Sequence, residues 1–283
     1  MICKSRTFGH CRRQPLLLDS CSSLTKQCSY AFCNPSRSHG SCDLVMLTNP
    51  SFDNGKGMEV HIRTKIEAFY SYISAAAIRI GDDIFEVQGG SVEHTYWLNG
   101  VHEAPLPASL SGHPVDHYVE KKQKRKTRKF GFEIVIGKRG EKIRIEYYKH
   151  FVSIFFREAT EQNFGSSAGL FGSYQTGLKL ARDGFTVMEN ASEFGMEWQV
   201  RGDDPKLFHN VSGGVVQYPE RCQLPTTTAE ESRRLRVDGV TNEQAHETCA
   251  LVDPEDYDDC VFDVIALDDL GTCVFISCFH SFS

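Results

Sequence analysis

The chain has 283 residues, of which 40% are hydrophobic and 24% are charged, and its formal net charge is -6. These values are ordinary for a globular protein and allow one large domain, or one domain with appendages. The negative charge gives no general attraction to nucleic acid, and no apolar run approaches the ~20 residues that a membrane-spanning helix needs. We therefore expect neither a nucleic-acid partner nor a membrane span.

Residues 1–38 are rich in Ser, Arg and Cys and have no sustained period, which predicts an irregular N-terminal segment. The apolar run Leu16-Leu17-Leu18 is too short for the core of a secretory signal, so no signal peptide is visible. The 11 cysteines lie only near the two ends, at Cys3, Cys11, Cys21, Cys28, Cys33, Cys42, Cys222, Cys249, Cys260, Cys273 and Cys278. Crosslinking would fit an oxidising compartment, while an odd number leaves at least one thiol unpaired or intermolecular. The first group contains no C-x2-C pair, which makes zinc the weaker interpretation.

A two-residue period begins near residue 40 and predicts strands. Over 58–66, apolar side chains on one face alternate with Glu59, His61, Arg63 and Lys65 on the other. Residues 77–80 and 84–87 read as two strands joined at Gly81-Asp82-Asp83. Asn99-Gly100 follows Tyr96-Trp97-Leu98 and is typical of a tight type I′ hairpin turn.

The same pattern continues in the second half of this region. Alternating apolar residues over 132–136 and 143–147 flank Gly137-Lys138-Arg139-Gly140, which predicts another hairpin. The nearly continuous apolar run 151–156 predicts a strand buried on both faces. Many short strands separated by turn residues indicate a mainly β protein with an antiparallel, sandwich-like domain over 39–222.

Two segments near the end of this domain carry the most specific pattern: Gly169-Leu170-Phe171-Gly172-Ser173-Tyr174-Gln175-Thr176-Gly177 and Phe194-Gly195-Met196-Glu197-Trp198-Gln199-Val200. They resemble the closing half of a von Willebrand factor type D domain, in which G-L-C-G-N-F-D-G leads into F-G-N-S-W-K-V. The chain departs from that pattern because Ala168 and Phe171 replace the paired cysteines, and Ser173 and Gln175 replace Asn and Asp. The resemblance covers about residues 40–222. It implies a non-catalytic extracellular or cell-surface interaction module that acts in adhesion or matrix assembly.

The resemblance also carries expectations for single residues. Family members commonly tie the entry and the end of the domain together, which implies a disulfide between Cys42 and Cys222. The family's loop holds calcium through several oxygen ligands, but here Asp183 is the only acid that matches well. We therefore expect no metal and no other cofactor, with Asp183 as the residual calcium candidate. Phe171 is expected to pack into the sandwich in place of the lost disulfide.

After Cys222 the character of the sequence changes. Residues 223–240 read as a linker, residues 241–270 as a helical hairpin, and residues 271–283 as an irregular tail. Thr241 and Gln244 form a capping-box pattern for a helix over about 242–250, and Asp253-Pro254 is typical of a second helix start. Cys249 and Cys260 would then lie one on each helix. We expect them to form a disulfide; two reduced core cysteines are the alternative.

Three surface motifs remain. Seven basic residues between two predicted strands could bind a polyanion or simply form a solvated hairpin loop: Lys121, Lys122, Lys124, Arg125, Lys126, Arg128 and Lys129. Asn190-Ala191-Ser192 and Asn210-Val211-Ser212 are sequons for N-glycosylation, which has a meaning only if the chain is secreted.

None of the common catalytic motifs is present, including G-x-S-x-G, H-E-x-x-H, the P-loop and G-x-G-x-x-G. We therefore expect an extracellular or cell-surface binding protein rather than an enzyme. Its expected partners are other proteins or an acidic polysaccharide, and it could also self-associate. Two alternatives stay open: a hydrolase or other enzyme built on the same scaffold, and an intracellular protein that binds polyanions through residues 121–129.

Overall fold

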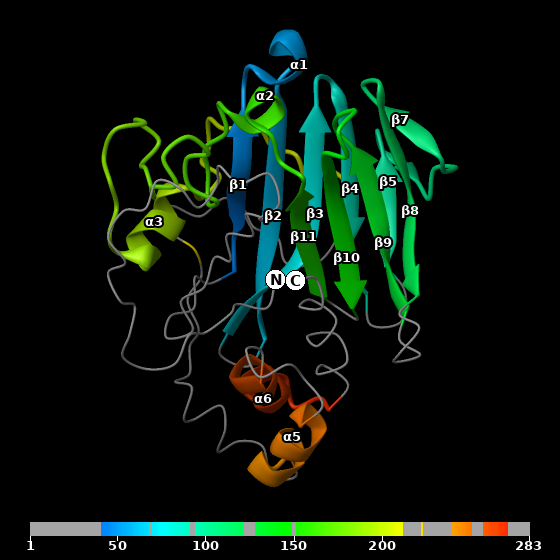
Figure 1. The fold of residues 1–283 in the computed structure, drawn as a ribbon, viewed down its shortest axis with the longest axis vertical. Helices are drawn as coiled ribbons and strands as arrows, with labels where there is room; N and C mark the ends of the chain where they lie inside the picture. The colour runs from blue at the N-terminus through cyan, green and yellow to red at the C-terminus, as the bar shows by residue number, and fades with distance from the viewer. Residues whose placement is uncertain are drawn as a thin grey trace.

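Two antiparallel β-sheets face each other in the computed structural model of the chain, and a pair of helices lies beyond one end of them (Figure 1). The structure describes residues 41–67, 70–90, 94–121, 128–148, 151–211, 222, 239–250 and 257–270. The expectation of a mainly β, sandwich-like fold is confirmed. Each sheet is built from strands that are consecutive in the chain, so the sandwich consists of two meanders.

The first sheet has six strands in the order β1-β2-β3-β4-β5-β6. Their bounds are Asp43–Asn49, Met58–Glu67, Tyr70–Ile80, Asp83–Gln88, Thr95–Leu98 and Val101–His102. Asn99 and Gly100 join the last two strands with φ angles of 51° and 79°, as a type I′ turn requires. The predicted hairpins at Gly81–Asp83 and at Asn99-Gly100 are therefore both present.

The second sheet has five strands in the order β11-β10-β9-β8-β7. In chain order from β7 to β11, their bounds are Ala108–Leu110, His113–Lys121, Arg128–Val135, Lys142–Tyr148 and Phe151–Arg157. The hairpin predicted around Gly137–Gly140 joins β9 and β10. β7 was not predicted, and β8 was expected only as an unspecified strand before the basic run. Its pattern is weak because it contains Pro114 and, among its residues with described side chains, only Val115 is buried.

The core lies between the two sheets and contains side chains from both. Phe85 on β4 and Phe132 on β9 are fully buried and meet edge to face, with ring centroids 5.2 Å apart. Phe171 packs against the same core, and its ring lies 4.9 Å from that of Phe156. The aromatic side chain at 171 therefore fills space in the sandwich, as predicted from the sequence.

Within the described residues, short helices accompany the sheets: α1 Phe52–Gly55, α2 Glu161–Phe164, α3 Ala191–Glu197, α5 Asn242–Cys249 and α6 Tyr257–Leu267. The capping box predicted at the start of α5 is present, because Gln244 N donates to Thr241 Oγ1 and Thr241 N donates to Gln244 Oε1. None of the described helices is long and apolar enough to cross a membrane.

Helices α5 and α6 form the predicted hairpin and share a small core of their own. It consists of Ala245, Cys249, Cys260 and Val264 and is separate from the core of the sandwich. The expected disulfide joins Cys249 to Cys260, with 5.8 Å between the Cα atoms. The predicted helix start at Asp253-Pro254 lies outside the described residues. So do residues 1–38, most of the linker, the tail and the remaining seven cysteines.

Candidate functional site

Both of the motif segments lie beside β1, at the edge of the six-stranded sheet. The amide of Val45 donates to the carbonyl of Trp198 at 2.7 Å, and the amide of Thr48 donates to the carbonyl of Ala168 at 2.8 Å. In Figure 1, α3 and the loops around it lie beyond this edge. Segments that are about 120 to 150 positions from β1 in the sequence thus satisfy its outer backbone groups and protect an edge that could otherwise pair with another chain.

Gly169 lets the first segment approach β1 closely. Its φ is +139°, and a Cβ atom built on it would lie 2.5 Å from the carbonyl oxygen of Met46. We predict that Gly169→Ala lowers the free energy of unfolding by about 2–3 kcal/mol, because it adds backbone strain and a clash with the neighbouring strand. Gly184→Ala is the matched control, since its φ is +78° but nothing lies within 4 Å of the added atom. Urea denaturation should show the larger loss for Gly169→Ala; equal losses would contradict the role of the close approach.

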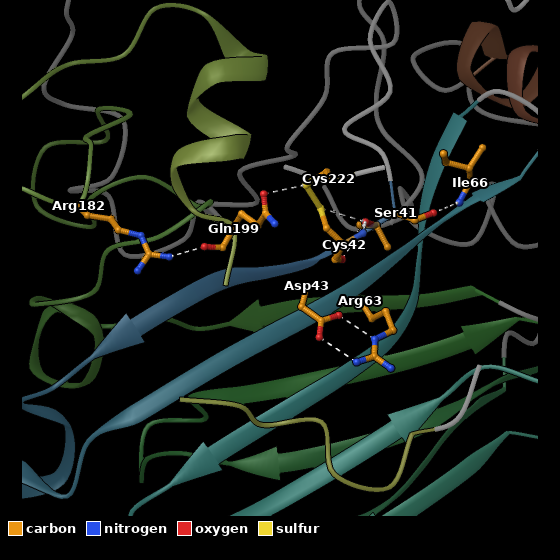
Figure 2. Close-up of a disulfide and its surroundings, with 9 residues drawn as sticks. Ser41, Cys42, Asp43, Arg63, Ile66, Arg182, Gln199 and Cys222 are labelled. Atoms are coloured by element: carbon orange, nitrogen blue, oxygen red, sulfur yellow. Dashed lines mark hydrogen bonds and ion pairs between the residues drawn. A yellow bond between two sulfur atoms is a disulfide. The ribbon is translucent and has the colours of Figure 1, made fainter. Parts of the chain in front are cut away.

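Arg182 lies in the small hairpin closed by the bridge between Leu180 and Val187. It connects this hairpin to the second motif segment, Phe194–Val200, and to Asp204 in the chain that follows. Its guanidinium donates to the carbonyls of Glu197 and Gln199 at 2.8 and 2.7 Å. It also forms a bidentate ion pair with Asp204, at 2.8 and 3.0 Å. Figure 2 shows this side chain pointing toward Gln199. The Trp198 ring is buried beside it, and its Nε1 donates to the carbonyl of Leu180 at 3.1 Å.

The Cys42–Cys222 disulfide is present, as the family resemblance implied, and closes this end of the site (Figure 2). The two Cα atoms are 5.1 Å apart, and 180 positions separate the residues in the sequence. Thr64 on β2 fixes the backbone of Cys42, since its hydroxyl lies 3.1 Å from the Cys42 amide and 3.0 Å from its carbonyl. The start of β1 is therefore held both covalently and by hydrogen bonds.

Residues 199–211, called here the covering segment, pass over the outer face of the six-stranded sheet. Phe208 lies against Arg63, with the guanidinium carbon 4.7 Å from the ring centroid. Arg63 in turn forms a bidentate pair with Asp43, at 2.7 and 2.8 Å, and both side chains are buried (Figure 2). The sequence predicted charged residues on this face of β2, but not that a distant segment would bury them.

His61 is the most unusual member of this buried polar layer. It is only 1% exposed, and neither ring nitrogen has a hydrogen-bond partner. Burial lowers the pKa of His61 to about 3, and the positive charges of Arg79 and Arg182 act in the same direction. Burial raises the pKa of nearby Glu59, which is 2.6 Å from Arg79. The site thus holds a neutral imidazole beneath the covering segment.

Asp183, the residual calcium candidate, lies at the tip of the small hairpin formed by the bridge between Leu180 and Val187. Its Oδ1 accepts hydrogen bonds from the amides of Phe185 and Thr186, and its Oδ2 accepts one from the Thr186 hydroxyl. These hydrogen bonds from Thr186 and Phe185 lower the pKa of Asp183. The carboxylate therefore already serves to shape the turn. Within the described part of the chain, no three His, Cys, Asp or Glu side chains gather as a metal group.

We predict that the fold is independent of calcium. Melting should occur at the same temperature in excess chelator and in millimolar calcium, because the Gly172–Asp183 loop supplies one well-matched carboxylate where calcium sites recruit several. Asp183→Ala should destabilise the turn equally in both buffers. A calcium-dependent rise of several degrees would contradict the prediction, since a ligand that binds only the folded state raises the melting temperature.

The other predicted site residues lie elsewhere in the fold. The basic run spans the junction of β8 and β9: Lys121 pairs with Arg128 at the strand ends, and residues 122–127 lie outside the described residues. Asn190 is exposed immediately before α3, whereas Asn210 lies in the covering segment and contacts Glu86. The structure therefore does not bring these residues together. Glu86, Arg182 and Asp204, which fasten the covering segment, were not singled out from the sequence.

Histidines and tyrosines also meet near the junction of the two sheets, where an enzyme could have placed a catalytic pair. His94 stacks on Tyr147 with ring centroids 3.7 Å apart, and His117 lies 5.9 Å from Tyr96. Burial lowers the pKa of His94 and raises that of Tyr147 to about 12. These contacts are between ring faces and edges, and they supply packing rather than an aligned proton-transfer pair.

No family model and no curated protein matches the sequence. The resemblance to the von Willebrand type D family therefore stays an interpretation of the two motif segments and the disulfide.

Proposed function

We propose that the chain is a non-catalytic interaction module of the von Willebrand type D kind, which acts outside the cell or at its surface in adhesion or matrix assembly. The observation that carries the proposal is the arrangement at β1. The two motif segments that resemble the family converge on one sheet edge, and a disulfide joins Cys42 to Cys222 at the same place. Such an arrangement suits a rigid binding module, because the residues that carry the family resemblance hold the edge of the sheet closed.

An oxidising location is supported by the two disulfides, each of which closes one of the two folded units. Mass spectrometry of the native protein under non-reducing conditions tests this part of the proposal. It should find both disulfides and report the mature N-terminus in material recovered from outside the cell. Reduced cysteines in protein confined to the cytosol would contradict the proposal and favour the intracellular polyanion-binding alternative.

We further propose an acidic polysaccharide as a partner, bound through the basic run. The run places seven positive charges within residues 121–129 of a chain whose net charge is -6. The positive electrostatic potential is therefore confined to this part of the surface. Positive residues beside the ends of β8 and β9 can attract sulfate and carboxylate groups, and added salt weakens such contacts.

The partner test is salt elution of the full chain from immobilised heparin. Lys124→Glu/Arg125→Glu should elute at much lower salt than the parent protein. Lys138→Glu/Arg139→Glu, in the exposed turn between β9 and β10, is the matched control and should elute near the parent. Equal elution of the two variants, or no retention of the parent, would overturn the proposed partner.

A further inference from the structure

Near its start, the covering segment makes an exposed turn over Arg201-Gly202-Asp203-Asp204. The amide of Asp204 donates to the carbonyl of Arg201 at 3.2 Å and closes the turn. Arg201, Gly202 and Asp203 are exposed, whereas Asp204 is half-buried. The turn therefore presents a guanidinium and a carboxylate at the surface, with one glycine between them in the chain.

The two neighbouring aspartates have different roles. Asp204 accepts two hydrogen bonds from the Arg182 guanidinium, and its Oδ2 also accepts one from the amide of Arg201 at 2.7 Å. By contrast, no described residue donates a hydrogen bond to the Asp203 carboxylate or forms an ion pair with it. Asp204 thus shapes the turn, and the oxygens of Asp203 stay available to a partner.

Lys206 holds the turn in place from the other side. Its ammonium group donates to the carbonyl of Arg201 and, at 2.7 Å, to that of Asp204. Together with the ion pair between Arg182 and Asp204, these contacts fix the backbone on both sides of Gly202 and Asp203. A partner would therefore meet a turn that is already ordered, and binding would cost little conformational entropy.

The Arg201 guanidinium has only a weak attachment within the protein. Its Nη2 lies 2.7 Å from Glu197 Oε2 and 3.2 Å from the Glu197 carbonyl oxygen, while Nε and Nη1 have no partner among the described residues. The side chains of this ion pair are 49% and 25% exposed. Water screens such a pair, so it contributes little to stability. An acidic group on a partner can therefore bind the guanidinium at small cost.

Gly202 leaves the backbone between the two charged residues open. Its φ lies outside the left-handed region, and no atom lies within 4 Å of a Cβ built on it. The fold therefore does not require glycine at this position. A partner that contacts Arg201 and Asp203 together, however, gains close access to the turn from the missing side chain.

We infer that Arg201-Gly202-Asp203 is a receptor-binding site of the kind that integrins recognise. The planar guanidinium suits acidic side chains of the receptor, and the Asp203 carboxylate can complete the coordination of a divalent cation that the receptor holds. The inference names a partner for the proposed extracellular role and rests on it. Binding between purified components does not depend on where the protein is found, so a negative result counts against the turn and not against the location.

The first arm measures binding of the full chain to purified integrins that recognise Arg-Gly-Asp, in buffer with magnesium. The parent should bind, and a soluble Arg-Gly-Asp peptide should displace it where an Arg-Gly-Glu peptide does not. Asp203→Glu keeps the charge but shifts the carboxylate by one methylene, and should weaken binding by about tenfold or more. Asp82→Glu, in the turn between β3 and β4, is the matched control at another exposed aspartate. No binding of the parent, or equal binding of the two variants, would overturn the inference.

The second arm separates recognition from folding with Gly202→Ala. This variant should melt at the same temperature as the parent, because the added methyl group meets no neighbouring atom. It should nevertheless bind the receptor several-fold more weakly, because the methyl group occupies the face of the turn that the receptor approaches. Binding equal to that of the parent would show that no receptor surface comes close to Gly202 and would overturn the inference.

Discussion

Removal of the Cys42–Cys222 disulfide should lower the free energy of unfolding of the sandwich by about 5 kcal/mol. The bond closes a stretch of 180 positions, and in the chain-entropy view a crosslink stabilises a protein by restricting its unfolded state, more so for longer loops. The test variant is Cys42→Ala/Cys222→Ala, which leaves no new thiol. Guanidinium unfolding followed by tryptophan fluorescence measures the loss, since both tryptophans, Trp97 and Trp198, lie in the sandwich.

The second disulfide provides the matched control for this measurement. Cys249→Ala/Cys260→Ala opens a loop of only 11 positions, in a helical hairpin whose core is separate from that of the sandwich. It should leave the fluorescence transition unchanged and lower the helical signal of the hairpin alone. If this variant destabilises the sandwich as much as the first, the two units are not independent, and the loop-closure argument is wrong.

The strands could be predicted where local sequence determines them. Alternation over 58–66 depends only on the two-residue repeat of a strand, and Asn99-Gly100 is one of the few pairs that accept positive φ at both positions. The capping box at Thr241 and Gln244 is likewise a local pattern. The bounds of β8 could not be found in this way, because most of its described side chains, including His117, are exposed or half-buried and only Val115 is buried.

The candidate site depends on contacts between residues far apart in the chain, and this is why the sequence revealed little of it. Glu86 meets Asn210, and Arg63 meets Phe208, across more than 120 positions. A glutamate on a strand ordinarily faces water. Glu86 is buried because the covering segment packs over it and donates backbone amides to its carboxylate. The family resemblance located the disulfide and the two motif segments, but not the polar layer beneath residues 199–211.

The buried polar layer beneath the covering segment makes the free energy of unfolding depend on pH, and His61 makes the largest contribution. Its pKa is about 3 in the folded protein because burial disfavours the charged ring, and Arg79, Arg182 and Lys206 oppose protonation while Asp204 favours it. The reference pKa of the same group is 6.5. Between these values the unfolded chain binds a proton that the folded chain does not. The free energy of unfolding therefore falls as the pH is lowered from 6.5 toward 3, and the contribution of His61 is complete above 6.5.

The expected slope is about 1.4 kcal/mol per pH unit, or about 2 kcal/mol between pH 6.5 and pH 5, where most carboxylates have not yet begun to titrate. Denaturant midpoints measured across this range should fall steeply for the parent protein. They should fall much less for His61→Leu, which keeps the volume but cannot bind a proton. His94, whose pKa burial also lowers, leaves a smaller residual slope. His102→Gln removes an exposed imidazole on β6 and should retain the parent slope. A parent slope unchanged in His61→Leu would mean that His61 gains access to water in the folded protein, and that the covering segment does not seal the face of the sheet it crosses.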